Sequence, residues 1–302
     1  MALPKSWGAA FDLLVMIKKL VIFGVGLIGG SFALALKEAQ RVQVVVGFGR
    51  DPSNLKSALA LGVIDEIGTD IPAALASADM VLLALPVGQI EPVLRKIGPW
   101  LADSTVVTDT GSTKTNIIAS AFEHLTHKQQ FVPAHPVAGA ESSGANAARA
   151  NLFQEKKIIL TPTDETSPAA RALVVGAWQA CGGKISYLSA AEHDALFAAV
   201  SHLPHVLAFA LVDYIAGHTD AAALFDFAAG GFRDFTRIAA SNPEMWRDIC
   251  LANKAPLLAE LGAYQARLTD IQNALATGDG AALLKIFSNS RFARNKWLQG
   301  SL

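Results

Sequence analysis

The strongest constraint on the fold of this chain is a glycine pattern that follows a short apolar segment. Residues 20–23 read LVIF, and GVGLIGGS follows at once, so that Gly24, Gly26 and Gly29 form G-x-G-x-x-G. The first glycine allows a tight strand-to-helix turn, the second lets the backbone approach a diphosphate, and the third lets the helix pack on the strand. Because the pattern follows a strand and opens a helix, it predicts a dinucleotide site. The residues expected to bind this ligand are Gly24, Gly26, Leu27, Ile28 and Gly29.

The next strand bears on which dinucleotide is preferred. It begins the segment VQVVVGFGRDPSN, residues 42–54. A site that binds NAD usually places an acidic residue at the end of this strand, for the ribose 2′-hydroxyl. Here Gly49 leaves room and Arg50 offers a guanidinium fork for a 2′-phosphate, so we expect NADP to be favoured. The alternative is that Asp51 reaches the ribose while Arg50 is a solvated surface charge, and NAD remains possible.

Strands and helices alternate through the first half of the chain. Apolar strands are expected within 78–87, 104–114, 130–139, 156–163 and 183–188. Continuous apolar strands separated by helices predict an α/β fold with a buried, mostly parallel sheet. Ligands of such sheets bind beyond the carboxyl ends of the strands. We therefore expect Pro86 and Thr110 to border the cofactor, and the loop that begins at His135 to reach the same cleft.

The second half of the chain is predicted to contain helices alone. Ser189-Ala-Ala-Glu192 is a capping box, and a long apolar helix follows it. A second helical region is expected to begin at Asn242 or Ser241, with Pro243 in its first turn.

We place the boundary between two domains near residue 188. A nucleotide-binding domain is expected at 16–188 and a helical domain at 189–302, with residues 1–15 as an extension outside the fold. The C-terminal helices look too apolar to form a layer on their own, which predicts an intertwined homodimer.

Charge and cysteine content exclude several classes of protein. The formal net charge is −1 at pH 7 and no run is rich in lysine or arginine, so we expect no nucleic-acid partner. Cys181 and Cys250 are the only cysteines, and two distant thiols give neither a disulfide framework nor a zinc site. No segment reaches the roughly 20 uncharged apolar residues of a membrane span. A cytoplasmic protein without a membrane partner is expected.

The seven histidines differ in their surroundings. Polar neighbours predict a surface position for four of them: His124, His127, His193 and His218. His135 follows an expected strand, whereas His202 and His205 lie in the apolar segment VSHLPHVLAFA, where Pro204 should bend the helix. A core position is the alternative for any one of these three, but together they favour a functional site. No third ligand accompanies His202 and His205, so no metal is expected.

Five motifs occur in a fixed order along the chain: GVGLIGGS, DTGSTK, AHPVAGAESSG, VSHLPH and GGFRDFTRIAASNPEMWRDI. In this order they resemble the prephenate/arogenate dehydrogenases of tyrosine biosynthesis, over roughly residues 18–300. The resemblance implies a Rossmann domain followed by a helical dimerisation domain, and NAD(P)-dependent oxidative decarboxylation of prephenate or arogenate. The chain departs from the family pattern at Gly49 and Arg50, where members that prefer NAD carry an acidic residue.

The resemblance assigns the proton chemistry to His135 and Ser112. His135 matches the histidine that engages the substrate hydroxyl, and Ser112 matches a serine that hydrogen-bonds the same region; a turn or helix cap is the alternative for Ser112. The substrate of this family is a cyclohexadiene with a ring carboxylate and a hydroxyl on the opposite carbon. The hydroxyl must lose its proton as hydride departs, and a histidine titrates in a suitable range. Loss of carbon dioxide then makes the ring aromatic.

The resemblance assigns substrate binding to the helical half. His205 matches a substrate-binding histidine, and Trp246 lines the same pocket. Arg237 matches the arginine that holds a substrate carboxylate, a group that suits a guanidinium fork. Asp234 matches its ionic partner, and Arg233 is expected to pair with an acidic neighbour or with solvent.

Two other functions remain open at this level. A β-hydroxyacid dehydrogenase has a similar two-domain organisation but relies on a lysine in its helical domain, and no lysine lies between Lys184 and Lys254. A non-catalytic NADP-sensing protein would not require His135, Ser112 and Arg237 to converge beside a nicotinamide.

Overall fold

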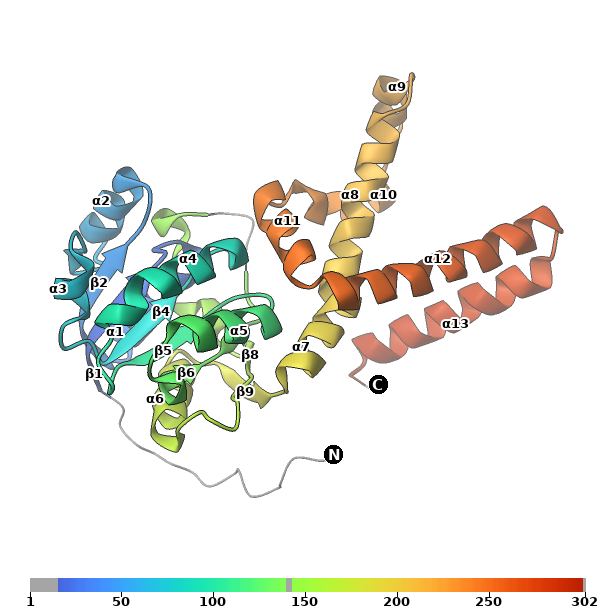
Figure 1. Ribbon diagram of the computed structural model, residues 1–302. Helices are drawn as coiled ribbons and strands as arrows, with labels where there is room; N and C mark the ends of the chain where they lie inside the picture. The colour runs from blue at the N-terminus through green and yellow to red at the C-terminus, as the bar shows by residue number, and fades with distance from the viewer. Residues whose placement is uncertain (1–15, 140–142, 301–302) are drawn as a thin grey trace.

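The computed structural model describes residues 16–139 and 143–300. The expected extension 1–15 and residues 140–142, which belong to the motif AHPVAGAESSG, lie outside this part of the chain. All strands of the described residues precede Leu188, and the chain from Ala190 onward is helical (Figure 1). The expected fold class, a mostly parallel sheet followed by helices, is confirmed.

The nucleotide-binding domain is built on a six-stranded parallel sheet with the strand order β3-β2-β1-β4-β5-β6. This order is that of a dinucleotide-binding Rossmann sheet. The central strand β1 pairs with β2 on one side and with β4 on the other, so that Val21 lies opposite both Val46 and Val81. The strands are β1 (Ile17–Phe23), β2 (Val42–Phe48), β3 (Glu66–Ile67), β4 (Met80–Leu83), β5 (Val106–Asp109) and β6 (Phe131–Val132).

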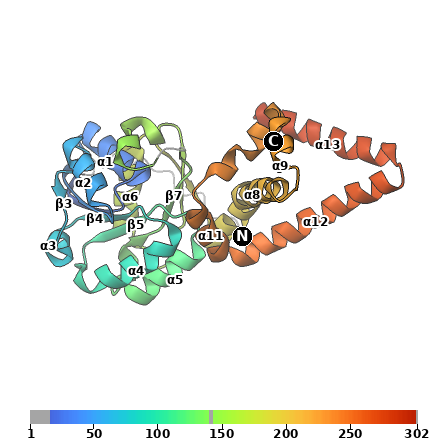
Figure 2. The same ribbon diagram turned by 90° about the horizontal axis from the view of Figure 1, so that it is seen from above.

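Helices cover both faces of this sheet (Figure 2). Side chains of a strand alternate between faces, so Leu20 and Ile22 join one buried cluster while Val21 and Phe23 join the other. The first cluster packs beneath α1 and α6, and the second packs beneath α4 and α5. The helices of this domain are α1 (Leu27–Glu38), α2 (Pro52–Ala60), α3 (Ile71–Leu75), α4 (Val87–Ile97), α5 (Thr115–His124) and α6 (Pro168–Ala180), with short 3₁₀ turns η1 (Gly98–Trp100), η2 (Lys128–Gln130), η3 (Ala145–Ala147) and η4 (Ala150–Phe153).

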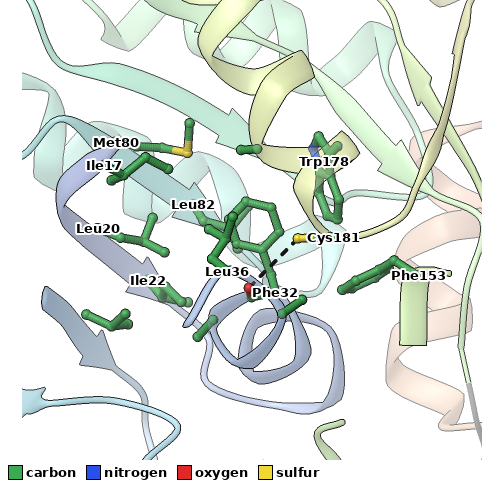
Figure 3. Packing of buried hydrophobic residues seen from close by; sticks show 14 of the residues in the cluster. Ile17, Leu20, Ile22, Phe32, Leu36, Met80, Leu82, Phe153, Trp178 and Cys181 are labelled. Atoms are coloured by element: carbon green, nitrogen blue, oxygen red, sulfur yellow. Dashed lines mark hydrogen bonds between the residues drawn. The ribbon is translucent and has the colours of Figure 1, made fainter. Parts of the chain in front are cut away.

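Aromatic packing joins α1 to α6 (Figure 3). The rings of Phe32 and Trp178 lie 4.5 Å apart, and Phe153 meets the other side of the indole at 5.0 Å. Cys181 lies in the same cluster, 4.0 Å from the Phe32 carbonyl oxygen, and burial raises the pKa of its thiol. Truncating Phe32 or Trp178 to alanine should cost about 3–5 kcal/mol of unfolding free energy, so this packing fixes the position of α1.

A second, three-stranded sheet carries His135. Its strands are β7 (Ala134–Pro136), β8 (Lys157–Leu160) and β9 (Lys184–Tyr187), with β7 antiparallel to β8. The expectation of one strand within 130–139 was wrong, because the chain leaves the first sheet after Val132 and enters the second at Ala134. Pro133, which cannot donate a ladder hydrogen bond, lies at this change of sheet.

The helical domain projects away from the sheets as a long helical rod and a helical hairpin (Figures 1 and 2). Two sequence predictions are confirmed at helix starts: Ser189 and Glu192 form the capping box, and the Asn242 side chain caps the helix that begins at Pro243. The elements are α7 (Ala190–Phe197), the π-helical turn η5 (Ala198–His202), α8 (Leu203–Ala216), α9 (Ala221–Asp226), α10 (Gly230–Thr236), the 3₁₀ turn η6 (Arg237–Ala240), α11 (Pro243–Ala252), α12 (Lys254–Ala276) and α13 (Gly280–Leu298).

The rod is irregular where Pro204 was expected to disturb it. Proline has no N–H to donate to the preceding turn, and the helix widens into η5 immediately before it. Among the described residues, the rod (Ala190–Ala216) is the one helix whose length and composition would allow it to cross a membrane, and 22% of its most apolar window is buried. Its first turns dock on the nucleotide-binding domain through Asp194, so this stretch is part of the folded protein.

Candidate active site

The turn between β1 and α1 has the shape that a dinucleotide requires. Gly24 has a φ of 98°, and a Cβ there would lie 2.1 Å from the Ala84 carbonyl oxygen. A Cβ on Gly29 would lie 2.2 Å from the Gly24 carbonyl oxygen, so helix and turn are in direct contact. A Cβ on Gly26 would meet no atom within 4 Å, and no side chain caps α1 at this residue. The open space in front of uncapped N–H groups fits a diphosphate.

The other predicted cofactor residues of this domain share the same edge of the sheet. Leu27 and Ile28 form the first turn of α1 and pack their side chains into the core, so their backbone is what can serve a ligand. Pro86, the N-cap of α4, lies three residues after the end of β4, and Thr110 directly follows β5. Because β1, β4 and β5 are adjacent and parallel, these residues lie at neighbouring carboxyl ends.

The loop after β2 leaves Arg50 available and engages Asp51. The Asp51 carboxylate caps α2 by accepting hydrogen bonds from the Ser53 N–H and hydroxyl, each at 2.8 Å. These hydrogen bonds lower the pKa of Asp51. Arg50 is exposed, and no hydrogen bond or ion pair to another described residue involves its side chain. Gly49 precedes it, where a Cβ would crowd Leu55 at 3.3 Å.

A buried ion pair shapes the loop after β5. Lys114 and Asp109 are both fully buried, and the Lys114 ammonium donates to the Asp109 carboxylate and, at 2.7 Å, to the Ala134 carbonyl. Asp109 also accepts from the Gly111 N–H at 2.7 Å and from the Ala134 N–H at 3.1 Å. Burial lowers the pKa of Lys114, and the Asp109 carboxylate opposes this change. The pair therefore fixes the backbone on either side of Ser112 and links it to the strand of His135.

His135 stands at one end of a chain of buried polar groups. Its Nδ1 lies 2.8 Å from Nε2 of His193, and Nδ1 of His193 lies 2.9 Å from Oδ1 of Asp194. Asp194 also accepts from the backbone N–H groups of Lys114 at 2.8 Å and Thr115 at 2.9 Å, at the start of α5. The chain thus begins in the helical domain and ends at a strand of the nucleotide-binding domain.

Burial and hydrogen bonding determine the protonation states of His135 and Asp194. The pKa of His135 lies well below 6.5, chiefly because the ring is buried, and the charges of His193, Lys114 and His202 lower it further. Burial would raise the pKa of Asp194, but the hydrogen bonds from His193, Thr115 and Lys114 outweigh it and bring the pKa to about 2. At neutral pH the site therefore holds a neutral His135 above an ionised Asp194, so the imidazole can accept a proton.

The rod brings His202 to the loop of Ser112. His202 is buried, its Nδ1 lies 3.0 Å from the Asn253 amide, and it hydrogen-bonds the Ser112 backbone. Burial lowers the pKa of His202 to about 4. The Asn253 amide also donates to the Asp194 carbonyl at 2.7 Å, so His202 and Asp194 are tied to one residue of the C-terminal helices.

The rings of His205 and Trp246 lie against each other in the helical domain. They stack at 3.6 Å with an angle of 19° between them, and His205 Nδ1 lies 2.9 Å from the Ser201 carbonyl oxygen. Burial lowers the pKa of His205, the hydrogen bond to Ser201 opposes this, and the charge of Arg237 lowers it further. Arg237 therefore lies within electrostatic range of His205. Asp234 is exposed one turn before Arg237, and the described residues include no ion pair between the two.

The structure also corrects the sequence-based placement of one histidine. The prediction that His193 lies at the surface was wrong, since its side chain is 0% exposed. The polar neighbours that suggested exposure, Glu192 and Asp194, serve a capping box and a domain contact instead. Sequence reasoning also missed Asp109, Lys114 and Asn253; the one signal was that DTGSTK places an acid and a base around the same loop.

A cleft of about 250 Å³ lies along the seam between α4, α5 and α11. Its lining includes Gly88, Asn116, Asp248 and Leu251, and none of the histidines of the site. Asp248 fills the space beside Gly88, where a Cβ would lie 2.5 Å from its carboxylate oxygen. The cleft therefore marks the docking of the two domains and is separate from the site of His135.

Two family models together match most of the chain. The model of the nucleotide-binding domain of prephenate dehydrogenase matches residues 32–187, and the model of the prephenate dehydrogenase dimerization domain matches residues 189–289.

Individual relatives match the chain over nearly its whole length. A cyclohexadienyl dehydrogenase of Zymomonas mobilis is 37% identical over 93% of this chain and 96% of that protein. The crystal structure of a prephenate dehydrogenase of Aquifex aeolicus with hydroxyphenyl propionate and NAD+ is 36% identical, with a TM-score of 0.88 over 93% of this chain and 99% of that one. A Synechocystis arogenate dehydrogenase structure is 30% identical, with a TM-score of 0.78 over 92% and 99% of the two chains.

Proposed function

Because this chain belongs to the prephenate dehydrogenase family, we propose that it catalyses the reaction of that family with His135 as the base and Arg237 as the carboxylate ligand. The reaction itself, NAD(P)-dependent oxidative decarboxylation of prephenate and/or arogenate in tyrosine biosynthesis, follows from family membership. The assignment of residues rests on one observation above all. A buried, neutral His135 lies on β7, and the preceding residue, Ala134, is hydrogen-bonded to Lys114 and Asp109 at the end of β5, in the sheet that carries the dinucleotide turn.

The first step is the removal of the substrate hydroxyl proton. A bound nicotinamide dinucleotide supplies the acceptor for the hydride that leaves the same carbon. His135 accepts the proton at Nε2, the ring nitrogen left after Nδ1 is engaged by His193. Ser112, whose backbone is held by His202, offers its hydroxyl to the oxygen as it becomes a ketone. The ketone then acts as the electron sink for loss of carbon dioxide from the opposite ring carbon.

The helical domain holds the substrate during this step. Arg237 binds the ring carboxylate as a charge-assisted fork, and His205 and Trp246 form an apolar wall that limits water. Asp234, one helical turn before Arg237, is proposed to contribute negative charge near it without a direct ion pair. These residues belong to a helical domain that we assign to 189–302, and the cofactor belongs to a domain that we assign to 16–188.

The preferred cofactor is proposed to be NADP. Asp51 is occupied as the cap of α2, so it is a poor partner for a ribose hydroxyl, whereas Arg50 is exposed and free to meet a 2′-phosphate. Gly24, Gly26, Leu27, Ile28 and Gly29 bind the diphosphate, and Gly49, Pro86 and Thr110 complete the cofactor site.

The protein is proposed to act as a cytoplasmic homodimer. The rod and the α12–α13 hairpin expose many large apolar side chains, among them Val200, Leu258, Leu284 and Phe287. A second copy of the helical domain, packed on this one, would cover them. The same pairing explains why an apolar helix such as Ala190–Ala216 is so little buried in a single chain.

Steady-state rates with prephenate and with arogenate, each with NAD+ and with NADP+, test this function. We expect an aromatic product and carbon dioxide from at least one substrate, with higher kcat/KM for NADP+. Absence of turnover with all four pairs would overturn the function, and a higher kcat/KM for NAD+ would overturn the cofactor assignment alone.

A further inference from the structure

His193 and Asp194 form a buried dyad directly behind His135. His193 is 0% exposed and Asp194 is 3% exposed, and the Phe197 ring stacks on His193 at 4.5 Å and contacts His135 at 4.6 Å. A stack of rings this close excludes water from the hydrogen bonds between them. Side chains buried in this way keep one geometry, which a surface ion pair does not.

The hydrogen bonds determine which nitrogen carries each proton. Asp194 accepts two backbone N–H groups and is an ionised acceptor, so Nδ1 of His193 must be the donor to it. Nε2 of His193 is then an acceptor, and Nδ1 of His135 must be the donor to it. Nε2 of His135 is left with its lone pair, and no hydrogen bond from the described residues engages it. This is the tautomer that a base needs.

We propose that His193 and Asp194 are positioning residues that fix this tautomer of His135 and take up its positive charge during turnover, a role that rests on the proposed function of His135 as the base. As the substrate hydroxyl proton bonds to Nε2 of His135, the proton on Nδ1 of His135 passes to Nε2 of His193. The positive charge then lies on the ring that donates to the Asp194 carboxylate. Reversal of the same transfers restores the resting tautomers when the proton leaves.

The groups around the dyad favour this transfer of charge. Lys114, paired with Asp109, and His202 both act on His135 and disfavour a positive charge there. Asp194 acts in the opposite direction and favours it. Burial and Lys114 lower the pKa of His193 as well, but its direct hydrogen bond to the Asp194 carboxylate opposes them, and His135 has no such contact with a carboxylate. His135 thereby remains neutral at rest and still has a place to pass the charge.

Two substitutions of His193 separate orientation from charge transfer. In His193→Gln the side-chain carbonyl can still accept from Nδ1 of His135, but the link to Asp194 is lost. In His193→Phe both are lost while the ring volume is kept. We expect kcat to fall about 10-fold in the first and about 100-fold in the second, with KM for prephenate changed much less, because a positioned proton transfer is worth about 100-fold or more. His127→Gln, half-buried on the nucleotide-binding domain, is the matched control and should keep wild-type kcat.

The pH profile of kcat/KM distinguishes this role from simple packing. In the proposed role, His193 and Asp194 stabilise the positive charge that arises when the site is protonated. Loss of either group makes protonation harder, so the acidic limb should move to lower pH in both His193→Gln and Asp194→Asn. If the acidic limb of the pH profile is unchanged in folded variants, the role of the dyad is overturned. Equal losses of kcat in His193→Gln and His193→Phe would also overturn it.

The tautomer of His135 can be read without any turnover. Nitrogen-15 spectra of the histidine-labelled wild-type protein, with His135→Asn to identify the signal, should show a protonated Nδ1 and an unprotonated Nε2. In His193→Phe the signal should change to a mixture of tautomers. The reverse tautomer in the wild type would overturn the proposal even if the enzyme is active. The expected spectrum in a protein that turns over no substrate would leave the dyad intact and overturn the proposed function instead.

Discussion

Helix α1 in the nucleotide-binding domain buries eight of its 12 residues, whereas α13 in the helical domain buries none of its 19. The first helix lies between a sheet and α6, and its partners come from the same chain. The second forms one arm of a hairpin whose other arm, α12, buries two of 23 residues. Side chains of the kind that fill the first domain's core, such as Phe287 and Leu284, are exposed here at 56% and 67%.

This difference shows that the two domains reach stability by different routes. The nucleotide-binding domain covers both faces of its sheet, so its own sequence determines a complete core. The helical domain leaves many large apolar side chains exposed in a single chain, and the family model that matches it describes a dimerization domain. The proposed site is divided in the same way: we assign the proton chemistry to His135, on a strand, and substrate binding to side chains of the helical domain.

The largest effect is expected where the helical domain needs its partner. Leu284→Glu should place a charge in the proposed dimer interface at two symmetric positions and weaken dimerisation by about 100- to 10,000-fold, from a burial of about 1.5–3 kcal/mol per side chain. Sedimentation equilibrium measures the change. Leu61→Glu, at a leucine 54% exposed on the nucleotide-binding domain, is the control and should leave the mass unchanged. If both variants dimerise equally tightly, the exposed face of α13 is not the dimer interface, and the helical domain does not need a partner to cover it.

The next effect tests whether turnover depends on the nucleotide-binding domain. His135→Asn should lower kcat by about 100-fold or more and leave the dissociation constant of the cofactor nearly unchanged. Burial lowers the pKa of His135 well below 6.5, so the neutral base is present at neutral pH and is lost only as pH falls through that low pKa. The acidic limb of the wild-type profile should therefore lie below pH 6.5 and should vanish in the variant. If rate and profile stay unchanged, the base lies elsewhere.

The third effect tests whether substrate affinity depends on the helical domain. Arg237→Ala should raise KM for prephenate by about 30- to 150-fold, because a charge-assisted fork to the carboxylate is lost. Lysine at this position should restore only part of the affinity, since it lacks the fork. Arg233→Ala is the matched control on α10 and should do much less. A larger loss in Arg233→Ala would mean that the other arginine binds the carboxylate.

The features that could be predicted from sequence are those set by local chemistry. The glycine turn, the capping box at Ser189 and the cap at Asn242 each depend on residues within one turn, and each is found where it was predicted. Apolar strands separated by helices were enough to predict the parallel sheet. Periodicity could not predict the change of sheet at Pro133, because both strands are apolar and nothing local distinguishes the two sheets.

The parts of the site that could not be predicted depend on contacts between distant residues. His193 looked exposed because its neighbours are charged, but Asp194 is held by the start of α5, 79 residues earlier in the chain. Lys114 and Asp109 were not singled out in the sequence, although both are fully buried. A charged residue is buried only when its partner is in place, and the partner is supplied by tertiary structure. Sequence motifs therefore indicated the residues that we propose to face the ligands, but not the buried groups that hold them in place.

The smallest effect concerns Arg50, which lies in the domain that is otherwise complete. Arg50→Ala should raise KM for NADP+ by about 5- to 10-fold, because an ion pair to a phosphate at an exposed position is screened by solvent and worth little. KM for NAD+ should hardly change, since NAD+ lacks the 2′-phosphate, and a higher salt concentration should reduce the difference between the two cofactors in the wild type. Asp51→Asn is the matched control: asparagine still caps α2, so cofactor preference should stay the same if the carboxylate serves only as a cap. Loss of NAD+ binding in Asp51→Asn, with NADP+ binding unaffected by Arg50→Ala, would show that Asp51 and not Arg50 reads the ribose. The Asp51 carboxylate would then both cap α2 and bind the ribose hydroxyl of NAD.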